Sequence, residues 1–168
     1  MRRRLLVRAV TVIALVAACA VCLDAASRTR SATGRITVGA LAKLSISTTS
    51  ISFGSENPDT TPQIQAGGGA ITITTKVRTT VGSTVSLSVL ASDDLRSSSA
   101  TIPISAVTWA VTGAGFVAGT MNKTVAQSVG SWVSSGARSG TQTYQLANSW
   151  TYATGSYSAT FTYTLSAP

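Results

Sequence analysis

Residues 157–165, YSATFTYTL, alternate strictly between apolar and hydroxyl-bearing side chains. The apolar set is Tyr157, Ala159, Phe161, Tyr163 and Leu165, and a serine or threonine stands at every position between them. Successive side chains of a β-strand point to opposite faces, so this period of two predicts a strand with one buried face and one face in water. Such a pattern is typical of an antiparallel sheet.

The same alternation recurs upstream in residues 70–79, AITITTKVRT, and in residues 84–89, TVSLSV. In the first of these segments, one face carries Ile71, Ile73, Thr75 and Val77. Serine and threonine make up a third of residues 36–168, and Val, Ile and Tyr, which favour strands, are common. Further strands are expected at 41–48, 50–53, 102–111, 116–121, 128–134 and 141–146.

Turn-forming residues separate these segments, with glycine, proline, asparagine or aspartate between most neighbouring strands. Short alternating strands with such punctuation predict an all-β fold. We expect an antiparallel β-sandwich of immunoglobulin-like, Greek-key type with about eight strands, preceded by an N-terminal signal helix.

The N-terminus has the features of an export signal. Residues 1–8 are rich in arginine, and residues 9–23, AVTVIALVAACAVCL, form an apolar run of fifteen. A membrane span needs about 20 apolar residues, so this run has the length of a signal-peptide core. The small residues Ala25 and Ser27 predict cleavage near position 27. The chain then divides into a signal peptide (1–27), a flexible lead-in (28–35) and a single domain (36–168).

Export predicts a location in the cell envelope or outside the cell, either periplasmic or extracellular. One alternative stays open, because residues 16–19, VAAC, resemble the lipobox of bacterial lipoproteins and would leave a lipidated Cys19 as a membrane anchor. Membrane contact is otherwise expected only through the leader. Cys19 and Cys22 are the chain's two cysteines, so residues 36–168 contain no disulfide framework.

Composition argues against several functional classes. The chain carries a net charge of +8, but from residue 36 onward six bases face four acids, so we expect no nucleic-acid partner. The chain has no histidine, which excludes histidine-based catalysis and histidine metal sites.

The four acids of the domain lie in two turns. Glu56 and Asp59 share one loop, and Asp93 and Asp94 are adjacent, so neither pair predicts two carboxylates facing each other across a scissile bond. A loose Ca²⁺ site at Asp93 and Asp94 is an alternative interpretation. We expect no enzyme, no catalytic or metal site and no cofactor.

The three tryptophans have different contexts. Trp109 stands between Val107 and Val111 on one strand face and is expected in the core. Trp132 and Trp150 lie near expected loops, which makes them the candidate surface or ligand contacts, with carbohydrate stacking as the interaction.

Parts of this chain resemble known families of bacterial surface proteins. Residues 153–168, ATGSYSATFTYTLSAP, resemble the closing strand of bacterial WxL cell-surface domains, with residues 163–165 standing where Trp-x-Leu would be. Residues 51–54, ISFG, resemble that family's early Phe-Gly strand end, and residues 109–111, WAV, give a Trp-x-Val. This resemblance implies non-covalent attachment to peptidoglycan.

The same segments are similar to spore coat protein U and to chaperone–usher pilin subunits, whose usual cysteine pair is missing here. That resemblance implies fimbrial-type assembly, in which a donated strand completes each subunit by main-chain pairing. Residues 36–44 would be the donor strand, because their apolar side chains alternate: Ile36, Val38, Ala40, Ala42 and Leu44.

Three functional hypotheses follow. The first is an exported, non-catalytic β-sandwich protein of the bacterial cell surface with a structural or cell-wall-associated role. Its partners would be cell-wall polymer or other surface proteins, including further copies of itself. The alternative is a pilus-type subunit assembled by strand donation. A carbohydrate-binding module is the second alternative.

Overall fold

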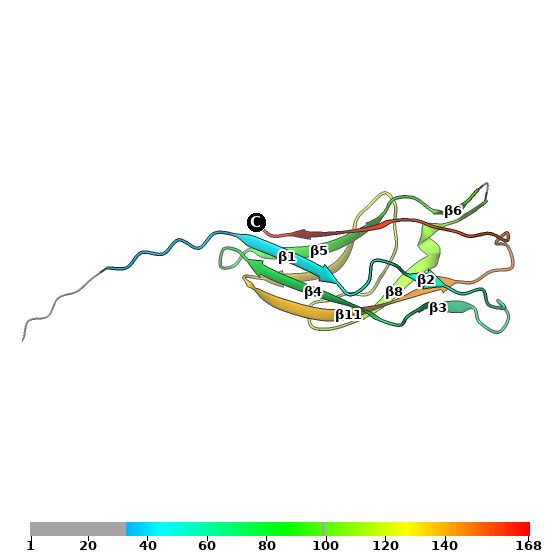
Figure 1. Ribbon diagram of the computed structural model, residues 1–168, viewed down its shortest axis with the longest axis horizontal. Helices are drawn as coiled ribbons and strands as arrows, with labels where there is room; N and C mark the ends of the chain where they lie inside the picture. The colour runs from blue at the N-terminus through cyan, green and yellow to red at the C-terminus, as the bar shows by residue number, and fades with distance from the viewer. Residues whose placement is uncertain (1–32, 99) are drawn as a thin grey trace, which may run out of the picture. The chain divides into compact units, whose positions relative to one another are not determined.

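The computed structural model describes residues 33–98 and 100–168. The expected signal peptide, its cleavage site and Cys19 lie outside the described residues, as does most of the lead-in. Residues Thr37–Pro168 form one unit, and it is all-β with antiparallel sheets, as expected (Figure 1). Within the described ranges, no helix has the length and apolar character needed to cross a membrane.

Twelve strands are present in the described residues, more than the eight or so expected. The count rises because irregular segments interrupt the pairing and leave several strands of two or three residues. The strands are β1 (Leu41–Ile46), β2 (Ser52–Phe53), β3 (Gln63–Gly67), β4 (Ile71–Arg78), β5 (Thr84–Ala91), β6 (Leu95–Ser97), β7 (Ala100–Ile102), β8 (Val107–Thr112), β9 (Gly119–Thr120), β10 (Gln127–Val133), β11 (Gly136–Ala147) and β12 (Phe161–Ser166). One 3₁₀ turn, η1 (Ile104–Ala106), precedes β8.

The larger sheet is organised around β11. Strands β4 and β3 follow each other along one edge of β11, and β8 pairs with its other edge. Strand β1 then pairs with β4, β2 with β3, and β9 with β8. Strand β1 therefore forms an outer edge of this seven-stranded sheet.

The smaller sheet has the order β10-β5-β12, and β6 and β7 form a separate two-stranded ribbon. Strand β5 lies between two partners, and its inward side chains Val85, Leu87 and Val89 are at most 2% exposed. Strand β12 pairs with β5 on one side and forms the outer edge on the other.

One hydrophobic cluster contains side chains of both sheets. Its most buried members include Ile73 of β4, Leu87 of β5, Val107 of β8 and Val129 of β10, none of which is exposed to solvent. The face predicted for residues 70–79 is confirmed, because Ile71, Ile73, Thr75 and Val77 are all buried. Trp109 is also in the core as predicted, with 3% of its surface exposed.

Hydrogen bonds between residues 113–120 and β10 close one side of the structure. The amide of Val117 donates to the carbonyl of Val129 at 2.9 Å, and the amide of Ser131 donates to the carbonyl of Gly115 at 3.0 Å. Gly115 has a φ of +81°, and a Cβ there would lie 2.3 Å from the indole nitrogen of Trp132. Glycine is therefore required for this close approach.

Candidate functional site

On the side of the structure opposite β10, no backbone hydrogen bonds join the outer strands of the two sheets among the described residues. Strands β1 and β12 are the outer strands of their sheets, and they lie beside each other without ladder pairing (Figure 1). We call these two unpaired edges the seam. Beyond β12, the carbonyl of Pro168 accepts a hydrogen bond from the Thr79 hydroxyl, which ties the end of the described chain to the residue that follows β4.

Apolar side chains along the seam are only half-buried. On β12 these are Phe161, Tyr163 and Leu165, whereas the equivalent inward residues of the neighbouring β5 are almost fully buried. On β1, Leu44 and Ile46 are half-buried as well. At the closed side, the inward residues of the edge strand β10 are 9% exposed or less. The seam therefore leaves apolar surface that an additional strand would cover.

A cavity of about 260 Å³ lies where the pairing between the two N-terminal strands and β3–β4 is interrupted. Its walls come from the segment between β1 and β2, from residues around the glycine run 67–69, and from Tyr144 of β11. The glycine run forms a bend in which Gly68 and Gly69 have φ angles of +83° and +77°. Side chains other than glycine adopt such angles only with strain.

A buried polar network crosses between the sheets next to this cavity. The hydroxyl of Tyr163 on β12 donates to Oε1 of Gln142 on β11 at 2.5 Å and pairs with the hydroxyl of Tyr144. Gln142 and Tyr144 are 0% exposed. Burial raises the pKa of Tyr144, and it raises the pKa of Tyr163 to about 12. Nε2 of Gln142 has no hydrogen-bond partner among the described residues.

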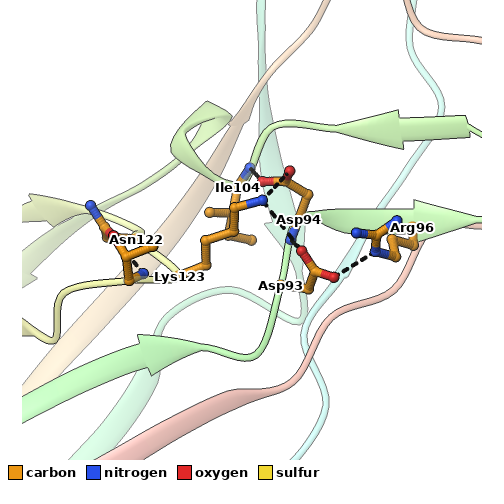
Figure 2. A network of polar contacts seen from close by, with 7 residues as sticks. Asp93, Asp94, Arg96, Ile104, Asn122 and Lys123 are labelled. Carbon is orange, nitrogen blue, oxygen red and sulfur yellow. Dashed lines mark hydrogen bonds and ion pairs between the residues drawn. The ribbon is translucent and has the colours of Figure 1, made fainter.

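Asp93 and Asp94, which the sequence placed in a turn, form an ion-pair cluster with Arg96 and Lys123 (Figure 2). Nε of Arg96 donates to Asp93 Oδ2 at 2.6 Å. Nζ of Lys123 donates to Asp94 Oδ2 at 2.6 Å and to Asp93 Oδ1 at 3.3 Å. The amide of Ile104 donates to Asp94 Oδ1 at 3.0 Å. The cluster thereby connects the β5–β6 turn, η1 and the loop before β10.

These contacts explain the acidity of both carboxyls. The Arg96 guanidinium lowers the pKa of Asp93, and the Lys123 ammonium lowers the pKa of Asp94. The same carboxylate oxygens were the expected ligands of a loose Ca²⁺ site. Because basic side chains and an amide already occupy them, the observed geometry is that of a structural clamp. Among residues 33–98 and 100–168, no group of three or more Cys, Asp and Glu side chains is arranged to hold a metal ion.

Trp132 is not a surface contact, which corrects one expectation. Its side chain is 9% exposed, and its indole N–H donates to the carbonyl of Ala114 at 2.9 Å. The Phe116 ring packs edge-on against it, with 5.0 Å between the ring centroids. Gly115 and Gly130, both against the indole, leave the space into which the ring folds. Proximity to a turn therefore did not imply exposure.

Trp150 is exposed, with 68% of its surface accessible. Its indole Nε1 donates to Asp59 Oδ1 at 3.0 Å. Next to it, the Asn148 side chain donates to the carbonyls of Glu56 and Thr61 at 3.0 and 3.1 Å. These bonds join loop 54–62 to the turn after β11 and fix the ring at the surface. The sequence indicated the exposed ring but not its carboxylate partner, which is 91 residues away.

The expected donor segment is divided in the structure. Ala42 and Leu44 belong to β1 and pair with β4 of the same chain. Ile36, Val38 and Ala40 precede that strand without regular secondary structure and are exposed, Ile36 by 90% and Val38 by 59%. Residues 36–40 thus carry free apolar side chains at alternate positions.

A scan against protein-family models finds no match to this chain, and searches of curated proteins and of solved structures find none either.

Proposed function

We propose that this chain is an exported, non-catalytic structural protein of the bacterial cell surface, and that it joins other surface components through the seam. The proposal includes the architecture of the domain, residues 36–168, as an immunoglobulin-like β-sandwich with Greek-key connections. The shared hydrophobic cluster and the crossing from β4 in one sheet to β5 in the other support that architecture. The basic and apolar leader of residues 1–23 supports export.

The observation that carries the proposal is the half-buried apolar surface on both edges of the seam. Free strand edges in monomeric proteins are usually protected by charged residues or proline. Strand β12, FTYTLS, contains neither. A strand added at this edge would gain main-chain hydrogen bonds, and burying the apolar surface would contribute about 25 cal/mol per Å². The edge therefore has the properties of an association surface.

The partner on the seam is either a surface polymer or another polypeptide. Strand donation between copies of this chain, the pilus-type alternative, is favoured by one specific observation. Ile36, Val38 and Ala40 are exposed at alternate positions, so their side chains would all face the seam of a second copy if the segment paired with β12. Ala42 and Leu44 would stay in β1 of their own chain.

Export is tested by fractionating bacteria that produce the full chain with a C-terminal epitope tag. The wild-type chain is expected in the envelope or the medium. A variant with Ile13→Asp and Leu15→Asp should remain in the cytoplasm, because charges disrupt the apolar run of the leader. Cytoplasmic retention of the wild-type chain would contradict the proposal.

Association is tested by light scattering of the purified exported chain over a range of concentrations. We expect oligomers for the wild-type chain and a monomer for Val38→Asp, since a charge on the donor side chain cannot be buried at the seam. Val81→Asp is the matched control, because Val81 lies in the turn after β4 and is 91% exposed. A wild-type chain that stays monomeric at every concentration, or equal loss with both variants, would refute strand donation.

A further inference from the structure

Trp150 is held in an arrangement that the proposed association through the seam does not use. The ring is the one aromatic side chain among the large exposed apolar residues of the described chain. Its N–H is occupied by Asp59, so the ring is fixed at its polar edge while two-thirds of its surface remains in water. Exposing a fixed indole to water leaves unfavourable apolar hydration that a ligand would relieve.

The surroundings of the ring are polar and small. The hydroxyls of Ser149 and Thr151 flank it in the chain and bond to each other at 2.8 Å. Oδ2 of Asp59 accepts no hydrogen bond from the described residues. A flat apolar face beside a free carboxylate oxygen and two hydroxyls matches the surface of a pyranose ring, which has an apolar C–H face and a rim of hydroxyl groups.

The size of the patch also distinguishes between ligands. A stable protein interface buries at least about 1,000 Å² in total, whereas one aromatic side chain contributes about 150–250 Å². A single ring with a polar surround is therefore too small for a protein partner but sufficient for one or two sugar units.

Charge narrows the class of sugar. Loop 54–62 and residues 147–152 contain the acids Glu56 and Asp59 and no base. Uronic acids and other anionic units would be repelled by these carboxylates, whereas uncharged hexoses would not. We propose that Trp150 and Asp59 form a binding site for neutral hexopyranose units of a polysaccharide, with the ring stacking on Trp150 and a sugar hydroxyl donating to Asp59.

The test is a titration of the full exported chain with cellotetraose and chitotetraose, two neutral oligosaccharides, and with trigalacturonate as the anionic probe. Trp109 and Trp132 are buried, so a change in tryptophan emission on binding reports on Trp150. In a parallel NMR titration, the indole N–H signal of Trp150 should shift over the same range of oligosaccharide concentration as the emission change, which would assign the binding to this site. At least one neutral probe should bind, and more tightly than trigalacturonate.

Variants separate the two contacts. Trp150→Ala should weaken binding about tenfold or more, because the stacking surface is lost. Asp59→Ala should weaken it severalfold, and Asp59→Asn less, since the amide oxygen still accepts the indole N–H. Calorimetry measures binding for the variant that lacks the fluorophore. Val125→Ala, at an apolar residue 60% exposed outside the two loops, is the matched control and should bind as the wild type does.

Three results would overturn the inference: no binding of either neutral probe at millimolar concentration, equal affinity of Trp150→Ala and wild type, or tighter binding of trigalacturonate. Denaturant unfolding of each variant shows whether the fold is intact. Because Trp150 and Asp59 are not seam residues, Trp150→Ala should leave the oligomeric state unchanged. Failure of the sugar site and failure of association are therefore distinguishable.

Discussion

Removing one hydroxyl from the buried polar network should destabilise the fold measurably. Tyr163→Phe deletes the group that donates to Gln142 Oε1 and pairs with the Tyr144 hydroxyl. Gln142 is 0% exposed, so its oxygen loses a partner where water does not reach it. An unsatisfied buried acceptor costs about 1–3 kcal/mol, and we expect Tyr163→Phe to lower the free energy of unfolding by about 2 kcal/mol.

The double variant tests the cause. Gln142→Met replaces the amide, whose Nε2 already lacks a partner among the described residues, with an apolar chain of similar size. Combined with Tyr163→Phe, it removes the stranded acceptor but still leaves the buried Tyr144 hydroxyl without its partner, so the double variant should lose less stability than the sum of the two single variants. The assay is urea unfolding followed by tryptophan fluorescence. Tyr157→Phe is the control, because that hydroxyl donates to a backbone carbonyl at an exposed position. Additive losses in the double variant would refute this reasoning.

Three further perturbations have expected outcomes. The pKa values of Asp93 and Asp94 are lowered by Arg96 and Lys123, so these carboxylates stabilise the fold above about pH 4, and the contribution is lost as pH falls through the lowered values. Asp94→Asn should therefore lower the urea midpoint at pH 7, with a gap to wild type that narrows below about pH 4; a constant gap would be inconsistent with ion pairing. A Cβ at residue 140 would lie 2.5 Å from the Thr112 carbonyl oxygen, so Gly140→Ala should cost about 1–3 kcal/mol in thermal or urea unfolding, whereas Gly39→Ala, with open space around it, should cost nothing measurable. Burial raises the pKa of Tyr144, so its neutral form contributes stability that is fully present below about pH 10 and is lost as pH rises further. Tyr144→Phe should flatten this alkaline decline in the urea midpoint, and an unchanged slope would count against the assignment.

Period-two alternation predicted where strands lie better than where they begin. Residues 157–165 alternate throughout, but β12 begins only at Phe161, so the expectation of a strand from Tyr157 was wrong. Burial alternates over eight residues in both β4 and β5, and strands were expected at 70–79 and 84–89. Strand β3 was missed because its five residues include a glycine and follow Pro62. Strand β11 begins at Gly136, inside an expected turn, because pairing of Gly136 with Val77 of β4 outweighs the local turn preference.

The candidate sites depend on contacts that are distant in the sequence. The exposure of Trp150 agrees with the prediction from its position near a turn, although the same reasoning was wrong for Trp132, and its bond to Asp59 joins residues 91 positions apart. The burial of Trp132 depends on Gly115 and Gly130, which are brought together only by the pairing of their segments. Likewise, the seam is a consequence of strand order. Alternation shows which face of a strand is apolar but not which strands end a sheet.

Disulfide trapping tests most directly whether the seam accepts a strand from a second copy. With Cys19 and Cys22 replaced by serine, the chain contains only introduced cysteines. Thr37→Cys is combined in turn with cysteine at the exposed β12 positions Thr162, Thr164 and Ser166, which cover the register of an added strand. Thr37→Cys with Ser131→Cys, on the closed edge strand β10, is the control.

The account predicts a ladder of disulfide-linked oligomers on a non-reducing gel for at least one β12 position and monomer for the control. Monomer at all three β12 positions, or an equal ladder in the control, would contradict it.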